Sequence, residues 1–245
     1  MKNILFPTDF STTTNPALGW ARLFAGHYPG ASLTLLHVFE PPTPDGSFLT
    51  FGDMGAGVEA SAELEHLSRE RVEMLATELR AEGLTVSTDW RMGDTEDTIR
   101  EVARTTGADL IIAGRTDVAT FFERLAGSAA NDIAADAPCP VLVIPVPDET
   151  AVGGSVQPRP AQLKNVVYVM QQDATRADVN KQTADLTDTF GSMLQFVTVD
   201  KLDGVIADLL IVADYGRGGL FAANPVRQVL AQNKIPVLVY HDKPE

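Results

Sequence analysis

Short apolar runs alternate with longer segments of helical periodicity through the first 146 residues. Each run has the length of a strand, and NILFP (3–7), closed by a proline, has the pattern of a buried one. The expected strands are 3–7, 32–39, 84–92, 109–114 and 140–146, and the expected helices follow Ser11, cover about 60–82, cover 94–107, and start near Gly127 to end before Pro138. This alternation predicts a parallel five-stranded sheet with right-handed crossovers and helices on both faces. Residues 40–60, rich in Pro, Gly and Asp, are expected to form a long loop.

Apolar residues at helical spacing predict the buried faces of the first two helices. They are Ala17, Leu18, Ala21, Phe24 and Ala25 in the first helix, and Leu64, Leu67, Val72, Leu75 and Leu79 in the second.

Three sequence blocks recur in the same order in the last third of the chain. KNILFPTD (2–9) returns as KNVVYVMQ from residue 164, ADLIIAG (108–114) as ADLLIVA from 207, and PVLVIP (140–145) as PVLVYH from 236. The offset between matched blocks falls from 162 residues to 99, so the second copy is expected to lack the long helix, the third strand and the third helix. We therefore predict a first domain at 1–146, a Pro/Gly-rich linker at 147–162 and a truncated second domain at 163–245.

Net charge excludes some classes of partner. The chain carries a formal charge of -14 and has a pI near 4.6, so nucleic acids and anionic membrane surfaces would repel it. No run approaches the ~20 apolar residues of a membrane span, and the N-terminal segment does not have the long apolar region of a secretory signal. The single cysteine, Cys139, is expected to be a buried thiol, and its isolation suits a reducing compartment. A cytoplasmic protein is expected.

The segment GRTDVATFFERLAGS (114–128) has the features of a phosphate-binding loop with one departure. Gly114 and Gly127 leave backbone amides accessible, and Ser128 precedes a helix whose first amides attract anions. Asp117 opposes a phosphate, because two unit charges ~4 Å apart repel by about 1 kcal/mol in water and about 4 kcal/mol at an effective dielectric of 20. Arg115, Arg124 or a bound Mg²⁺ would offset that repulsion. The plainer interpretation is that Gly127 and Ser128 cap a helix.

The first half resembles the universal stress protein family over its whole length. NILFPTDFS (3–11), GDTEDTIREVARTTGADLIIAG (93–114) and APCPVLVIPV (137–146) match its opening, middle and closing segments. The spacing Gly114, two residues, Asp117, nine residues, Gly127–Ser128 keeps the pattern of ATP-binding members except that Asp117 replaces a glycine. The resemblance implies a flavodoxin-like, Rossmann-like sheet, an adenine-nucleotide site in some members, and dimers formed through the last strand. It places the nucleotide site at Pro7, Thr8, Asp9, Val38, Gly114, Arg115, Asp117, Gly127, Ser128 and Ala129.

Several functions remain open for such a chain. The leading hypothesis is a stress-response regulatory protein that binds one adenine nucleotide, ATP or AMP, in its first half. The alternatives are an interaction scaffold without a nucleotide, and a slow ATP-hydrolysing enzyme, for which no convincing general base is found. The second half is expected to have no site, because Gln171, Ala213 and Asn224–Pro225 replace the motif residues. His37 is expected to be a packed strand residue, and GAGVEA (55–60) lies too far from a strand to bind a dinucleotide.

The last strand of each half suggests how the halves assemble. PVLVIPV (140–146) and PVLVY (236–240) are apolar strands that would otherwise expose a sheet edge. We expect them to pair antiparallel within one chain and form an intramolecular pseudo-dimer. A homodimer of whole chains is a further expectation from the resemblance.

Overall fold

The computed structural model describes residues 1–10, 14–40, 54–114, 137–145, 162–170, 177–214, 226, 229–230 and 234–241. The strands are β1 (Asn3–Pro7), β2 (Ser32–Phe39), β3 (Thr85–Met92), β4 (Leu110–Gly114), β5 (Val141–Ile144), β6 (Asn165–Met170), β7 (Met193–Thr198), β8 (Leu209–Asp214) and β9 (Val237–His241). The helices are α1 (Thr14–His27), α2 (Met54–Ala81), α3 (Thr95–Thr105), α6 (Ala177–Phe190) and the short 3₁₀ helix η1 (Val199–Lys201). Among the described residues, no helix is long and apolar enough to cross a membrane.

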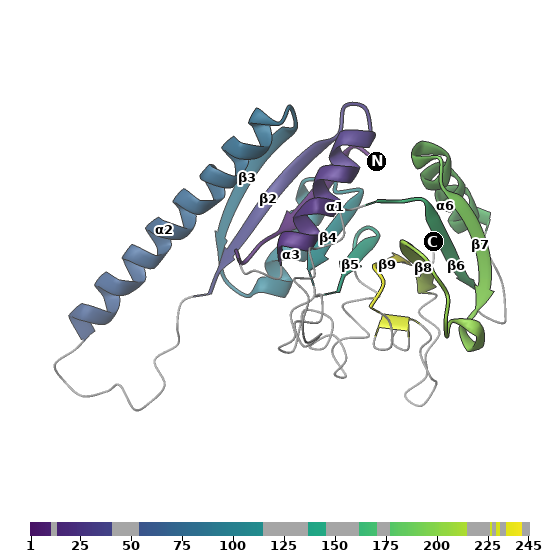
Figure 1. Cartoon of the computed structure of the whole chain (residues 1–245). Helices are drawn as coiled ribbons and strands as arrows, with labels where there is room; N and C mark the ends of the chain where they lie inside the picture. The colour runs from purple at the N-terminus through teal and green to yellow at the C-terminus, as the bar shows by residue number, and fades with distance from the viewer. Residues whose placement is uncertain are drawn as a thin grey trace, which may run out of the picture.

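All nine strands form one continuous sheet in the order β3-β2-β1-β4-β5-β9-β8-β6-β7 (Figure 1). The first five are parallel, as the alternation of strands and helices predicts. The last four are also parallel to one another. The two groups meet where β5 pairs antiparallel with β9, with Leu142 opposite Leu238. The expected antiparallel pairing of the two last strands is thus present within one chain.

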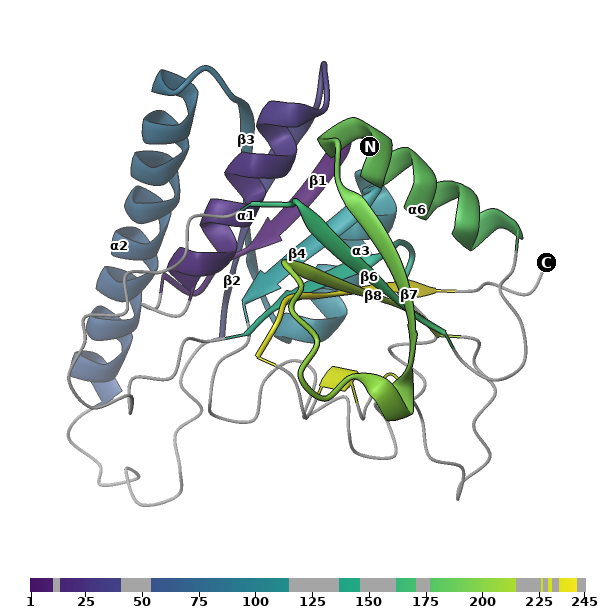
Figure 2. The ribbon, with the colours of Figure 1, turned by 45° about the vertical axis from the view of Figure 1, so that its right-hand side comes forward.

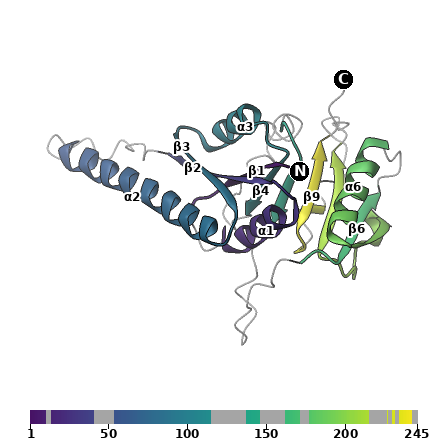
Figure 3. The same ribbon diagram turned by 90° about the horizontal axis from the view of Figure 1, so that it is seen from above.

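Helices cover both faces of the sheet. The helices α1, α2 and α6 share one face and one hydrophobic core, which extends across both groups of strands. The helices α1 and α6 lie on this face (Figure 2). Phe190 of α6 contacts the rings of Phe24 and His27 of α1 and of Tyr28, which follows α1. The helix α3 covers the opposite face, packing Ile99 and other residues on the strands there (Figure 3). The halves are therefore joined through side chains as well as through the β5–β9 ladder.

The contacts that hold β1 and β4 together recur between β6 and β8. The carboxylate of Asp109 accepts hydrogen bonds from the backbone N–H groups of Lys2 and Asn3, at 2.6 and 2.9 Å. The carboxylate of Asp208 accepts the same pair of bonds from residues 164 and 165, at 2.9 and 2.8 Å. The strand registers also correspond, because Ile4 lies opposite Leu110 just as Val166 lies opposite Leu209. The sequence blocks that recur thus occupy equivalent places in the sheet.

The helix α2 differs from its expected form. It begins at Met54, inside the segment 40–60 that was expected to be a loop, so GAGVEA lies within a helix. Its first half extends away from the sheet (Figures 1 and 3). For that reason Leu64 and Leu67, expected to be buried, are 51% and 46% exposed. Periodicity identified the apolar side of the helix but did not show where the sheet beneath it ends.

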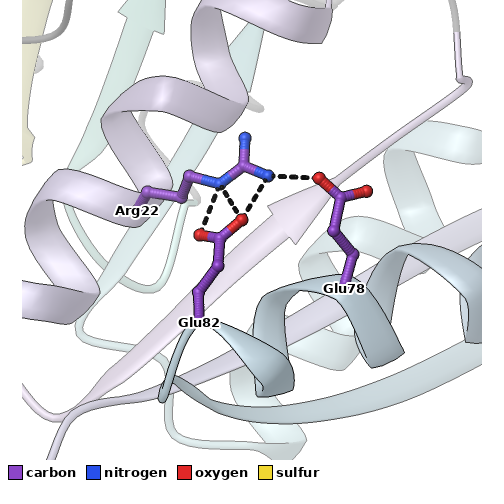
Figure 4. Close-up of polar contacts among 3 residues, drawn as sticks. All are labelled: Arg22, Glu78 and Glu82. Atoms are coloured by element: carbon purple, nitrogen blue, oxygen red, sulfur yellow. Dashed lines mark hydrogen bonds and ion pairs between the residues drawn. The ribbon is translucent and has the colours of Figure 1, made fainter.

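An ion-pair cluster fastens the other end of α2 to α1 (Figure 4). Arg22 of α1 donates from Nε and Nη2 to the carboxylate of Glu82, at 2.8 to 3.1 Å. Its Nη2 also donates to Glu78 at 2.8 Å. The sheet and this cluster hold the C-terminal half of α2 in place.

Candidate functional site

The order of strands reverses at β1, and this places the candidate site. The strand β1 lies between β2 and β4, which are reached by crossovers in opposite directions along the sheet. In open parallel sheets, ligands collect beyond the carboxyl ends of strands at such a reversal. Pro7 lies level with Leu36 of β2, and the register of β1 on β4, carried three residues further, brings Thr8 level with Gly114. The residues predicted from three separate sequence segments therefore meet at one edge.

Thr8 is the best-fixed residue of this edge. It is buried, and its N–H donates to the carbonyl of Leu36 at 2.8 Å, which continues the β1–β2 ladder. Its hydroxyl accepts the N–H of Phe10 at 3.1 Å. Its carbonyl accepts a hydrogen bond from Nδ1 of His37 at 2.8 Å, so the proton of the neutral imidazole lies on Nδ1. These bonds hold the end of β1 rigidly in place.

The chain turns sharply just after Thr8. Phe10 has a φ of 59°, a left-handed conformation that bulky residues rarely adopt. Its ring packs on the imidazole of His37, with ring centroids 4.9 Å apart. Asp9 lies between Thr8 and Phe10 and is exposed. Strained backbone of this kind persists only where its surroundings hold it. Asp9 therefore lies at the carboxyl edge, directly beyond the end of β1.

The neighbouring end of β2 is acidic. Glu40 follows β2 and accepts hydrogen bonds from the N–H and hydroxyl of Thr95, at 3.1 and 2.6 Å. The carboxylate of Asp94 caps α3 by accepting the N–H groups of residues 96 and 97. Val38, partly buried, packs on the core beneath α3. A ligand at this edge therefore meets carboxylates and an apolar side chain on the β2 side, and Gly114 on the β4 side.

The structure describes half of the predicted site residues. Pro7, Thr8, Asp9, Val38 and Gly114 lie at or near the carboxyl ends of β1, β2 and β4. Arg115, Asp117, Gly127, Ser128 and Ala129, with the helix expected after them, lie outside the described residues. His37, expected only to pack within its strand, also donates a hydrogen bond to the carbonyl of Thr8, which the sequence did not indicate. The one available signal was a polar ring near the end of a strand next to β1.

Two other expectations concern Cys139 and the second half. Cys139 is buried, as expected, and is not part of a disulfide. Ala213 near the end of β8 occupies the place of Gly114 and lies opposite Tyr240, as Gly114 lies opposite Ile144. Burial raises the pKa of Tyr240 well above its ordinary value, so its hydroxyl stays neutral. Within the part of the chain that the structure describes, no group of three or more His, Cys, Asp or Glu residues is placed to hold a metal ion.

The fold and its switch-point edge define an α/β protein of the doubly wound type. A model of the universal stress protein family matches residues 1–145, and the chain belongs to that family. No curated protein was found to match the sequence.

Solved structures show where the whole-chain fold recurs. A functionally unknown protein from Pseudomonas aeruginosa PAO1 is 18% identical with a TM-score of 0.63, covering 98% of this chain and 92% of that one. A universal stress protein from Archaeoglobus fulgidus DSM 4304 is 14% identical with a TM-score of 0.62, covering 98% and 96%. A universal stress protein solved in complex with cAMP is 19% identical with a TM-score of 0.37, covering 60% and 98%, and the bound cAMP is a property of that protein.

Proposed function

We propose that this chain is a regulatory binding protein that takes one adenine nucleotide at the carboxyl edge of β1 and β4. The observation that carries the proposal is the convergence of Thr8, Asp9 and Gly114 at the reversal of strand order. Asp9 is exposed and lies beside the strained turn at Phe10, and a carboxylate at this position accepts hydrogen bonds from a ribose or an adenine amine. The glycine at the end of β4 leaves room for a phosphate to approach the backbone.

Charge decides how the nucleotide is oriented. Asp9, Glu40 and Asp94 lie towards β1 and β2, and they disfavour phosphates there. The uncharged base and ribose therefore belong on that side, against Val38. The phosphates belong beyond Gly114, where the sequence supplies Arg115, Gly127 and Ser128. Any Mg²⁺ would enter with the phosphates of the nucleotide.

We further propose that residues 163–245 are a truncated second copy of the domain and carry no site. The matched aspartate contacts and the matched registers support descent of both halves from one domain. Ala213 and the bulky Tyr240 replace Gly114 and Ile144 at the equivalent place, and Gln171 replaces Asp9. The second half would serve as a built-in partner that covers β5.

Calorimetric titration with ATP and AMP, each with and without Mg²⁺, tests the proposed function. We expect one nucleotide per chain, and native mass spectrometry showing two per chain would contradict the single site. Asp9→Asn should weaken binding about tenfold or more, because it removes a charged acceptor. Asp203→Asn, an exposed aspartate of the second half, is the matched control and should leave the affinity unchanged.

Asp117 provides a second test of the same site. Asp117→Gly should tighten ATP binding at least several-fold, because it removes a like charge and restores backbone freedom. Asp117→Asn removes the charge but keeps the side-chain volume, so it separates the two causes. AMP should gain less than ATP, since it carries fewer charges. Binding with no turnover in a phosphate-release assay would exclude the slow hydrolase, and no binding by any variant would favour the scaffold.

A further inference from the structure

The two outer strands of the nine-stranded sheet, β3 and β7, are unequal. Within the described part of the chain, β3 pairs with β2 alone and β7 with β6 alone (Figures 1 and 2). An outer strand offers unpaired N–H and C=O groups to other strands, and natural proteins protect such strands with charges, proline or bulges. The two edges differ in this protection.

The edge at β3 is protected by charge. Its sequence is TVSTDWRM, and Asp89 and Arg91 within it form an ion pair at 2.8 Å. A second strand laid along β3 would have to accommodate both charges. The helix α2 also packs on β3 and β2 from one face, with Trp90 donating to the hydroxyl of Ser68 on that helix.

The edge at β7 has no such protection. Its sequence is MLQFVT, with six residues, no charge and no proline. Met193 is 61% exposed and Phe196 52% exposed, although both belong to residue types that are usually buried. By its place beside β6, β7 corresponds to β2 of the first half, which β3 and α2 cover. Among the described residues of the second half, no strand lies beyond β7.

We propose that β7 pairs antiparallel with β7 of a second copy of this chain, so that a homodimer carries one sheet through both chains. Charge favours a second copy as the occupant. In a twofold contact the same surface patch lies on both sides, so a charged patch would face a copy of itself. The chain carries a net charge of -14, so most of its charged surface would repel its own copy. Two copies of such a chain can therefore contact each other through a stretch of uncharged, partly apolar residues. The sheet already contains an antiparallel joint between edges, at β5 and β9.

Twofold symmetry also limits the register. An axis perpendicular to the sheet keeps each side chain on its own face, so a residue at the axis lies opposite its own copy. With the axis at Phe196, Leu194 lies opposite Thr198, and the two Phe196 rings become cross-strand neighbours. Phe196 already lies beside Tyr168 of β6, with ring centroids 5.7 Å apart. The four rings would form one continuous aromatic row across the dimer.

Sedimentation equilibrium of the full chain, from about 1 to about 100 µM, tests the proposal, since interfaces of moderate quality associate at micromolar concentrations. We expect a dimer with twice the mass of one chain. Phe196→Lys should weaken dimerisation at least about tenfold, because it opposes like charges at the axis. The matched control is Met92→Lys at the other edge, where the side chain is 54% exposed, and it should leave the dimer intact. A wild-type chain that stays monomeric through this range overturns the proposal, as does a dimer that only Met92→Lys dissociates.

Cross-linking gives a readout that does not depend on introducing a charge. In a chain with Cys139→Ala, Phe196→Cys should form a disulfide-linked dimer on mild oxidation, because residues facing each other across antiparallel strands come close enough. Met92→Cys, treated identically, should remain monomeric. Efficient cross-linking through Met92→Cys with none through Phe196→Cys would place the interface elsewhere and overturn the proposal. The circular dichroism spectrum of each variant reports whether it has folded.

Discussion

Leu238→Ala at the β5–β9 joint should destabilise the first half of the chain although the substituted residue lies in the second. Leu238 and the facing Leu142 are both fully buried, and they belong to the core that α1, α2 and α6 share. A Leu→Ala change at a buried site costs about 2 to 5 kcal/mol of the free energy of unfolding. With a urea dependence of about 3 kcal/mol per molar, a loss of about 3 kcal/mol lowers the unfolding midpoint by about 1 M.

The two tryptophans make this measurement specific. The chain's two tryptophans, Trp20 and Trp90, both lie in the first half, so tryptophan fluorescence reports unfolding of that half alone. Circular dichroism reports both halves. Leu210→Ala is the matched control, since Leu210 is equally buried but belongs to a core within the second half. If the joint makes the two halves one cooperative unit, each variant lowers the urea midpoint measured by fluorescence. For each variant, the midpoint measured by circular dichroism then falls by the same amount. A fluorescence midpoint unmoved by Leu238→Ala would refute the coupling.

Two further predictions concern Arg22 and Tyr240. Arg22→Ala should cost about 1 kcal/mol of unfolding free energy, the upper end for a partly exposed ion pair, because the contact with Glu82 is bidentate. Urea titrations should show this cost shrinking in high salt. Burial raises the pKa of Tyr240, so above about pH 10 the unfolded chain loses a phenolic proton that the folded chain retains. Stability should therefore fall as pH rises above about 10, and it should fall less in Tyr240→Phe, measured by urea titration at several pH values.

The strands and their parallel arrangement could be predicted from the sequence because strand-length runs, most of them apolar, alternate with segments of helical periodicity. In the first half the observed β1 and β2 have the predicted bounds, and β3, β4 and β5 each begin one residue later than predicted, with β5 also ending two residues earlier. The start of α2 could not be predicted, because Gly55 and Gly57 favour a loop by local propensity. Neither could the exposure of Leu64, since periodicity identifies a face but not the extent of the sheet beneath it.

The candidate site also combines features that could be predicted from the sequence with features that could not. Asp9 and Gly114 follow strand ends, and the ends of parallel strands meet at one edge, so their convergence could be predicted. The contact between His37 and the carbonyl of Thr8 depends on the register of β1 on β2 and on a side-chain rotamer, which no local pattern carries. The left-handed φ of Phe10 is equally hidden, because a phenylalanine gives no sign of a turn that would usually take glycine.

On the proposed descent of both halves from one domain, the shape of the sheet explains which elements the second half could lose. The strand β9 covers the apolar edge of β5, and β8 and β6 follow it in order, with the carboxylate of Asp208 fastening β8 to the start of β6. The counterpart of β7 in the first half is β2, and β3 lies beyond β2. A strand of the second half that matched β3 would therefore lie beyond β7. That position is the farthest from the joint. A deletion there leaves the contact between Leu142 and Leu238 untouched, whereas loss of β9 would expose the whole edge of β5. The strand that such a deletion leaves at the edge is β7, whose sequence carries no charge and which we propose pairs with a second chain.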